Sequence, residues 1–236
     1  MKRGLSMGLA VMMMAVSVLG CGKGGQGSSE SPEKTQESGA VTEKIQAEEL
    51  KVAVIGEPST LDVHMTSAFI IQEIGYHILE GLYTIDGDYN TVPMLAEDTK
   101  VSEDNTHYTI RLRKGVTFHN GKELTAQDVE ASLKRWVEKT SYGAILGKIL
   151  DKIQVTDDYT VELYLTEPSV VVTTLLAFPN QQGGIYPKES IEAAGEKGIP
   201  EEYIIGTGPY RFLEHRPDQY VKLAKYQEYC PREEEP

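Results

Sequence analysis

The sequence predicts an α/β fold of the mixed, α+β-like kind, in which short antiparallel hairpins and amphipathic helices share one domain. Residues 106–113, 152–156 and 159–165 alternate apolar with polar positions, which is typical of half-buried strands. Residues 125–137 instead repeat apolar side chains at helical spacing behind a capping signal. The chain has 236 residues and is 40% hydrophobic and 25% charged, an ordinary composition for a soluble globular protein. That length suffices for one large domain or two small ones.

Charge and cysteine content exclude several classes of protein. The formal net charge is −13, and no basic stripe is present to neutralise phosphates, so we expect no nucleic-acid partner. The two cysteines, Cys21 and Cys230, do not form a disulfide framework. We expect Cys230 to be a lone thiol, whereas Cys21 lies in a special position.

The first twenty residues read as a targeting signal. Two basic residues precede an apolar run, residues 5–19, which is too short for a comfortable membrane span of about 20 residues. The run ends at Cys21, directly after Gly20, in a pattern similar to the bacterial lipobox. We therefore predict a lipoprotein signal peptide over 1–20 and lipidation of Cys21, whose acyl chains would hold the protein at a membrane surface. The alternative is an ordinary signal peptide with a coincidental cysteine.

Composition separates a stalk from a folded domain. Residues 21–48 consist mostly of Gly, Ser, Glu, Lys and Gln without aromatics, and predict a flexible stalk. Residues 49–236 form the predicted domain. Within it, the alternating stretch 49–55 predicts a first strand, residues 67–82 predict a helix, and a further strand is expected to start at Tyr83.

Two hairpins of similar pattern follow. The first spans residues 99–113 and the second residues 152–165, and both carry a V-[ST]-x-D pattern at the turn. A repeat array with a period of about 50 residues would be one explanation. Nothing else recurs, so we expect two antiparallel hairpins in one sheet.

Residues 112–133 combine a turn with a helix start. Asn120-Gly121 is a strong tight-turn signal, because both residue types tolerate positive φ. Thr125 is a favourable N-cap residue, and Asp128 takes the acidic position of a capping box. Capping accounts for Asp128 without catalysis. The helix continues with apolar positions expected in the core: Leu124, Val129, Leu133, Trp136 and Val137.

The order of residues in this stretch, LxKGxxFHxGxxLTAxDV, resembles the signature of extracytoplasmic solute-binding proteins, family 5, the oligopeptide/dipeptide/nickel class. Gly206-Thr207-Gly208-Pro209-Tyr210 and the I-x-P-K pattern at 185–188 resemble further motifs of that family. The resemblance runs from about residue 50 to the C-terminus. It implies a periplasmic-binding-protein-like type II fold, in which two lobes clamp a solute for an ABC importer. Members are considerably longer, so we expect the first lobe only, truncated before the second lobe.

The resemblance also implies a site and partners. In the family, the loop after the first strand lines the cleft between the lobes, which points here to Glu57, Pro58, Ser59, Thr60 and Leu61. A plain strand-to-helix connector is the alternative. The expected ligand is a peptide or similar small solute, with nickel chelates, haem and sugars left open. The expected partners are ABC permease and ATPase subunits, with the protein lipid-anchored on the extracytoplasmic face of the cell membrane, in the periplasm or at the cell surface. A signalling or adhesion lipoprotein could reuse the same fold.

Nothing in the sequence favours an enzyme. The five histidines are scattered without metal-ligand spacing, and His119 reads as a turn residue. No G-x-S-x-G elbow is present, and Gly206-Thr207-Gly208 lacks the lysine of a phosphate-binding loop. We therefore expect no catalysis, no metal site and no cofactor.

Overall fold

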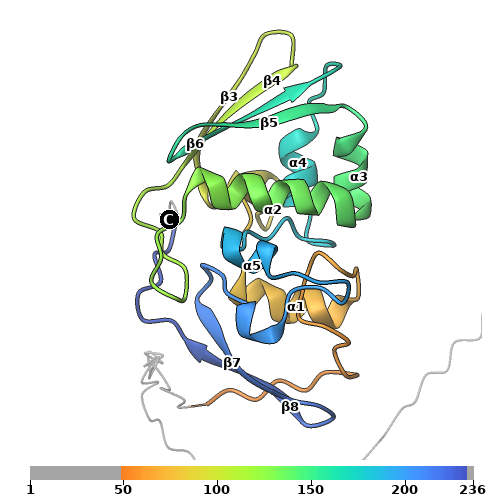
Figure 1. The fold of residues 1–236 in the computed structure, drawn as a ribbon, viewed down its shortest axis with the longest axis vertical. Coiled ribbons are helices and arrows are strands. Elements are labelled where there is room, and N and C mark those ends of the chain that lie inside the picture. Colours follow the sequence, from red (N-terminus) through yellow and green to blue (C-terminus); the bar gives the residue numbers. More distant parts are fainter. Residues whose placement is uncertain (1–48, 233–236) are drawn as a thin grey trace, which may run out of the picture. The chain divides into compact units, whose positions relative to one another are not determined.

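A four-stranded antiparallel sheet with a long helix packed on it organises half of the structure, a computed structural model that describes residues 49–232 (Figure 1). The strand order is β3-β4-β6-β5. These strands are β3 (Ala96–Val101), β4 (His107–Leu112), β5 (Leu150–Asp157) and β6 (Thr160–Leu165). Each predicted hairpin is present, and β4 pairs with β6 to join them. The prediction of two hairpins in one sheet is therefore confirmed.

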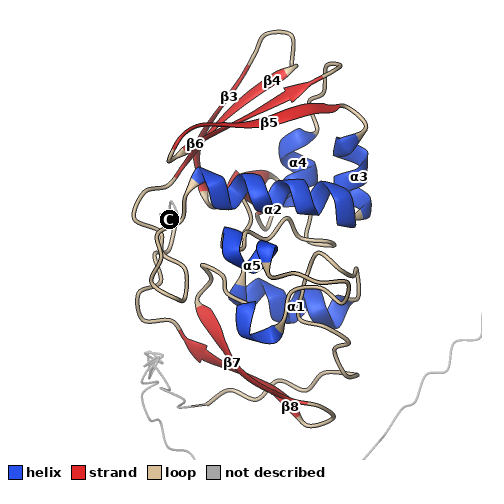
Figure 2. Cartoon of the chain, viewed as in Figure 1, coloured by secondary structure: helices blue, strands red, loops and turns tan. Residues whose placement is uncertain are grey.

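Helix α2 (Ala126–Lys139) covers the inner face of this sheet. Burial alternates along β4 and β6, which places every second side chain against the helix. Two shorter helices follow: α3 (Ser141–Gly147) packs against α2, and α4 (Val172–Ala177) packs against α3 (Figure 2). Trp136 is fully buried, as expected, in the hydrophobic core that α2 forms with the sheet, and its indole N–H donates to the Gln181 carbonyl oxygen at 2.9 Å.

A second hydrophobic cluster forms around α1 (Phe69–Ile78). Its members are Leu61, Val63, Ile71, Ile78, Leu79, Tyr186, Ile199 and Ile204. Around it lie α5 (Lys188–Glu192), the 3₁₀ helix η1 (Glu201–Tyr203) and the hairpin of β7 (Tyr210–Arg216) and β8 (Tyr220–Lys225). A small hairpin of β1 (Tyr83–Ile85) and β2 (Thr91–Pro93) completes the fold.

Helix α1 is shorter than the predicted helix over 67–82. The backbone turns extended at Leu79 (φ −118°, ψ 142°), although the Leu79 N–H still donates to the Gly75 carbonyl at 2.8 Å. The chain must leave the helix there to reach β1, whose start at Tyr83 agrees with the sequence. Tertiary connection thus overrides a helical pattern that continues one turn further.

The predicted first strand over 49–55 is wrong for this structure, because these residues form no strand ladder. Leu50 and Ile55 are almost fully exposed, at 83% and 104%. Alternating residues become a strand only where a neighbouring strand satisfies their backbone groups. Within residues 49–232, no segment pairs with this one.

The tight turn at Asn120-Gly121 is confirmed with a modified geometry. The Gly121 N–H donates to the Phe118 carbonyl at 2.8 Å, and the Phe118 N–H donates to the Lys122 carbonyl at 2.8 Å. Gly121 has φ +81°, whereas Asn120 keeps negative φ. This pattern is a type I turn followed by a left-handed glycine, in place of a turn with two left-handed residues.

The predictions for the N-terminus lie outside the described residues. They are the signal peptide over 1–20, lipidation at Cys21 and the stalk over 21–48. Among the helices that the structure does describe, none is both long and apolar enough to cross a membrane.

Candidate functional site

The predicted ligand loop, residues 57–61, leads from the extended N-terminal segment into the second core. Glu57 and Ser59 are exposed, whereas Pro58 and Leu61 are buried. None of the backbone N–H and C=O groups of these five residues has a hydrogen-bond partner among the described residues. Pro58 and Leu61 thus fix the loop to the core, while its main chain is not held by hydrogen bonds within the described residues.

A buried ion pair fixes the end of this loop. Thr60, which is half-buried, accepts a hydrogen bond from the Asp62 N–H at 3.1 Å. The Asp62 carboxylate in turn accepts from both Arg135 guanidinium ends at 3.0 and 2.5 Å, and from the Ile199 N–H at 2.9 Å. Asp62 is 0% and Arg135 7% exposed. Burial alone would raise the pKa of Asp62, but the Arg135 hydrogen bonds and charge keep it below its usual range.

His64 lies beside this ion pair as a neutral, structural side chain. It is fully buried, and its Nε2 lies 3.0 Å from the Gly184 carbonyl oxygen. Burial lowers its pKa to about 4. The ring packs edge-on against Tyr186 at a centroid distance of 5.3 Å, and the Tyr186 hydroxyl accepts from the Val63 N–H at 3.1 Å. These contacts hold Val63 and His64 against the segment at Gly184 and Tyr186.

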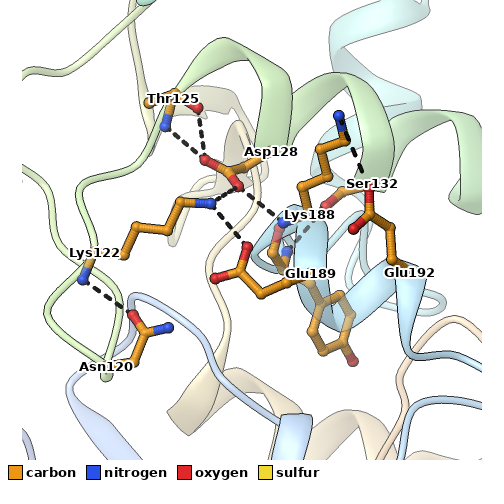
Figure 3. Close-up of polar contacts among 9 residues, drawn as sticks. Asn120, Lys122, Thr125, Asp128, Ser132, Lys188, Glu189 and Glu192 are labelled. Atoms are coloured by element: carbon orange, nitrogen blue, oxygen red, sulfur yellow. Dashed lines mark hydrogen bonds and ion pairs between the residues drawn. The ribbon is translucent and has the colours of Figure 1, made fainter.

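Asp128 joins the signature helix to a second motif, and Figure 3 shows the arrangement. Its buried carboxylate accepts from the Thr125 N–H at 3.0 Å and hydroxyl at 2.7 Å, which confirms the capping role. It also accepts from the Lys122 ammonium and from the Lys188 N–H, each at 2.8 Å. Burial opposes ionisation, yet these hydrogen bonds hold the pKa of Asp128 below its usual range. The contact with Lys188, at the start of α5, connects segments 60 residues apart.

His119 connects the two family-like motifs directly. The backbone N–H of His119 donates to the Gly206 carbonyl oxygen at 2.9 Å, and its ring Nδ1 accepts from the Gly206 backbone N–H at 3.3 Å. Its Nε2 can then donate to the Gly208 carbonyl, 2.9 Å away. This pattern fits a neutral imidazole, consistent with burial lowering the pKa of His119. The expectation of a turn residue is correct, but the sequence does not reveal this second contact.

Four aromatic side chains, Phe69, Tyr76, Tyr142 and Phe178, form what we call the aromatic surface. Phe69 is 76% exposed at the start of α1, and Tyr76 follows two turns later on the same side of the helix. The Tyr76 hydroxyl donates to the Pro179 carbonyl, next to Phe178. The Phe178 ring packs on Tyr142 of α3 at a centroid distance of 5.0 Å. This surface was not predicted from the sequence. Phe69 gave one signal for it, because this aromatic residue lies outside the apolar stripe of its helix and is therefore expected to be exposed.

Comparison with known proteins matches residues 90–236 to the family of bacterial extracellular solute-binding proteins, family 5. A probable peptide ABC transporter periplasmic-binding protein from Sinorhizobium fredii is 30% identical over 186 residues, 75% of this chain and 33% of that protein. A glutathione-binding protein from Pectobacterium atrosepticum is 29% identical over 187 residues, covering 78% and 35% of the two chains. This chain thus spans about a third of the length of the curated relatives it matches.

Solved structures agree with these matches. The binding protein AgaA of A. tumefaciens R10, in complex with agropinic acid, has a TM-score of 0.66 and 31% identity, covering 74% of this chain and 35% of its own. The oligopeptide-binding protein AppA of Bacillus subtilis, in complex with a nonapeptide, has a TM-score of 0.64 and 26% identity, covering 75% and 36%. These neighbours confirm the periplasmic-binding-protein-like fold, and this chain covers about a third of each of them.

The family match covers more than half of the chain. It includes both motifs that the structure joins through His119, as well as the Asp128 network that links the signature helix to α5. The chain belongs to family 5 of the bacterial extracellular solute-binding proteins.

Proposed function

We propose that this chain is part of a substrate-binding lipoprotein of an ABC importer, which captures peptides or a similar small solute outside the cell membrane. The observation that carries the proposal is the family match over residues 90–236. It is supported by curated relatives that are named for peptide transport and glutathione binding. Such a protein performs no catalytic step. It hands its solute to permease and ATPase subunits after its lobes close on the ligand.

The ligand would contact two features of the described domain. The backbone groups of residues 57–61 are free to hydrogen-bond an extended peptide, whose main chain carries the same groups whatever its sequence. Phe69, Tyr76 and Phe178 of the aromatic surface supply exposed apolar area, which in soluble proteins commonly marks a binding site. Together they would bind main chain and side chains of a peptide without a dedicated charged pocket.

The N-terminal part of the proposal rests on sequence. Cleavage after residue 20 and lipidation of Cys21 would anchor the protein, and residues 21–48 would give the binding domain, residues 49–236, reach from the membrane. Mass spectrometry of the mature N-terminus should find a diacylated or triacylated cysteine. A Cys21→Ala variant should lose membrane fractionation, and an unmodified N-terminus in the wild type would contradict lipidation.

Ligand identification tests the proposed function itself. The protein is purified as its complete reading frame encodes it, and small molecules released by denaturation are analysed by mass spectrometry. We expect peptides or a peptide-like solute, enriched over a lipoprotein of another family prepared in parallel. A protein that carries no solute and takes up none from a mixed peptide library would contradict the proposal.

A further inference from the structure

A cavity of about 490 Å³ lies between β7, η1 and the turn at Asn120. Its wall includes a histidine, His215, that sits between two carboxylates. His215 Nε2 lies 2.7 Å from Glu57 Oε1, and its Nδ1 lies 2.6 Å from Glu201 Oε1. The His215 side chain is 8% exposed, whereas the Glu57 and Glu201 side chains are 38% and 47% exposed. Three segments distant in sequence therefore meet at one imidazole.

The two contacts need a particular protonation state. A neutral imidazole carries one N–H, and only the imidazolium donates from both ring nitrogens. A neutral His215 would therefore direct a nitrogen lone pair at one of the two carboxylates. The carboxylates lie at opposite ring nitrogens and do not converge on a common point, and within residues 49–232 no group of three acidic, Cys or His side chains is arranged to hold a metal ion. The geometry thus fits a proton on both nitrogens.

Glu57 extends the connection to the hairpin turn. Its second carboxylate oxygen accepts from the Asp218 N–H at 2.9 Å, between β7 and β8. Hydrogen bonding by Glu201 is the largest influence on the imidazole, and together with Glu57 it raises the pKa of His215 above 6.5 against the effect of burial. Glu57 is the first residue of the loop proposed to contact ligand, so its contacts with His215 and Asp218 fix one end of that loop.

The other charged groups around the cavity do not take over this contact. Arg211 and Glu214 of β7, Glu202 of η1 and His119 line the same cavity. Glu214 accepts from Arg216, and burial lowers the pKa of His119, so this second histidine is the neutral one. Across the hairpin, His215 pairs with the apolar residue Val221.

We propose that His215 is a pH-sensitive clamp, which when protonated fastens residues 57–61 to η1 and the β7–β8 hairpin, and which releases this loop on losing its proton. The clamp is closed while His215 is protonated and both carboxylates are ionised, and it opens as the pH rises through the pKa of His215, which lies above its usual value in the folded protein. An effect of the clamp on solute affinity rests on the proposed function, but the clamp itself does not.

Nuclear magnetic resonance of the purified protein tests the clamp without a ligand. The ring resonances of His215 give its protonation state, and the exchange rate of the Asp218 amide, corrected for intrinsic exchange, reports the Glu57 contact. We expect His215 to titrate with a midpoint above 6.5, and Asp218 exchange to rise about tenfold over the same pH range, since a hydrogen bond to a charged group is worth roughly that factor or more. Glu57→Gln and Glu201→Gln should each lower the midpoint, whereas Glu202→Gln, on the same 3₁₀ turn, should leave it unchanged.

The outcomes separate the clamp from the proposed function. A His215 midpoint that is the same in wild type and Glu57→Gln, or Asp218 exchange that does not follow it, would overturn the clamp. Once a solute is known, its affinity should change with the same midpoint in wild type and lose this pH dependence in His215→Gln. A protein that titrates as expected but binds no solute would leave the clamp standing and remove the proposed function instead.

Discussion

Replacing Asp128 by asparagine tests whether the family signature is a structural network. Asp128 is completely buried and accepts four hydrogen bonds, two from Thr125 and one each from Lys122 and Lys188. Loss of the capping interaction costs about 0.5–2 kcal/mol. Loss of a hydrogen bond to a buried charge costs about 1.5–3 kcal/mol. Lys122 is 40% exposed, so its ion pair adds little. Asparagine keeps one acceptor oxygen, but its NH₂ group would face N–H or O–H donors that the second Asp128 oxygen now accepts. We therefore expect a net loss of about 3 kcal/mol in the free energy of unfolding.

Equilibrium urea unfolding, followed by the fluorescence of the single tryptophan Trp136, measures this loss directly. The matched control is Glu130→Gln on the same helix, whose pair with Lys134 is exposed and should matter by less than about 0.5 kcal/mol. Equal, small effects of the two variants would refute the reasoning, because they would show that Asp128 does not hold α2 to α5.

Three further predictions concern the second core. Arg135→Met leaves the buried Asp62 carboxylate without its cation and should lower the free energy of unfolding, measured in urea, by about 3–5 kcal/mol. The added Asp62→Asn change should restore part of that loss, and full additivity of the two changes would contradict the pairing. Gly206→Ala would place a Cβ 2.0 Å from the Ile78 carbonyl oxygen, so a thermal shift assay should show a destabilisation of about 1–3 kcal/mol, and an unchanged melting temperature would disprove that close approach. The pKa of His64 is near 6.5 in the unfolded chain but about 4 in the folded protein. The free energy of unfolding should therefore fall as the pH drops from 6.5, and His64→Gln should flatten that slope. An unchanged slope in the variant would assign the pH dependence to other groups.

Local chemistry explains the parts of the fold that the sequence predicts correctly. The start of α2 is determined by Thr125 and Asp128, three residues apart, and the two hairpins by alternation and turn residues within a few positions. The buried place of Trp136 follows from its spacing on one helix. In each case the residues that decide the structure lie within one or two turns of chain.

Long-range contacts explain the rest. The stretch 49–55 alternates like a strand, but a strand also needs a partner, and none of the described segments provides one. Arg135 reads as a polar helix position until the fold places Asp62, 73 residues away, against it. The link from His119 to Gly208 across 89 residues likewise has no local signal. The aromatic surface depends on three segments that meet only in the folded chain.

Titration calorimetry with the solute identified by mass spectrometry tests the central claim most directly, using the protein that its complete reading frame encodes. We expect saturable binding at one site in the micromolar range or tighter, weakened about tenfold by Tyr142→Ala through loss of aromatic contact. The exposed Tyr89, in the turn between β1 and β2, provides a control as Tyr89→Asn, since asparagine tolerates its positive φ of 66°. Unchanged affinity in Tyr142→Ala would contradict the placement of the site, and the absence of saturable binding to any peptide or peptide-like solute would contradict the function.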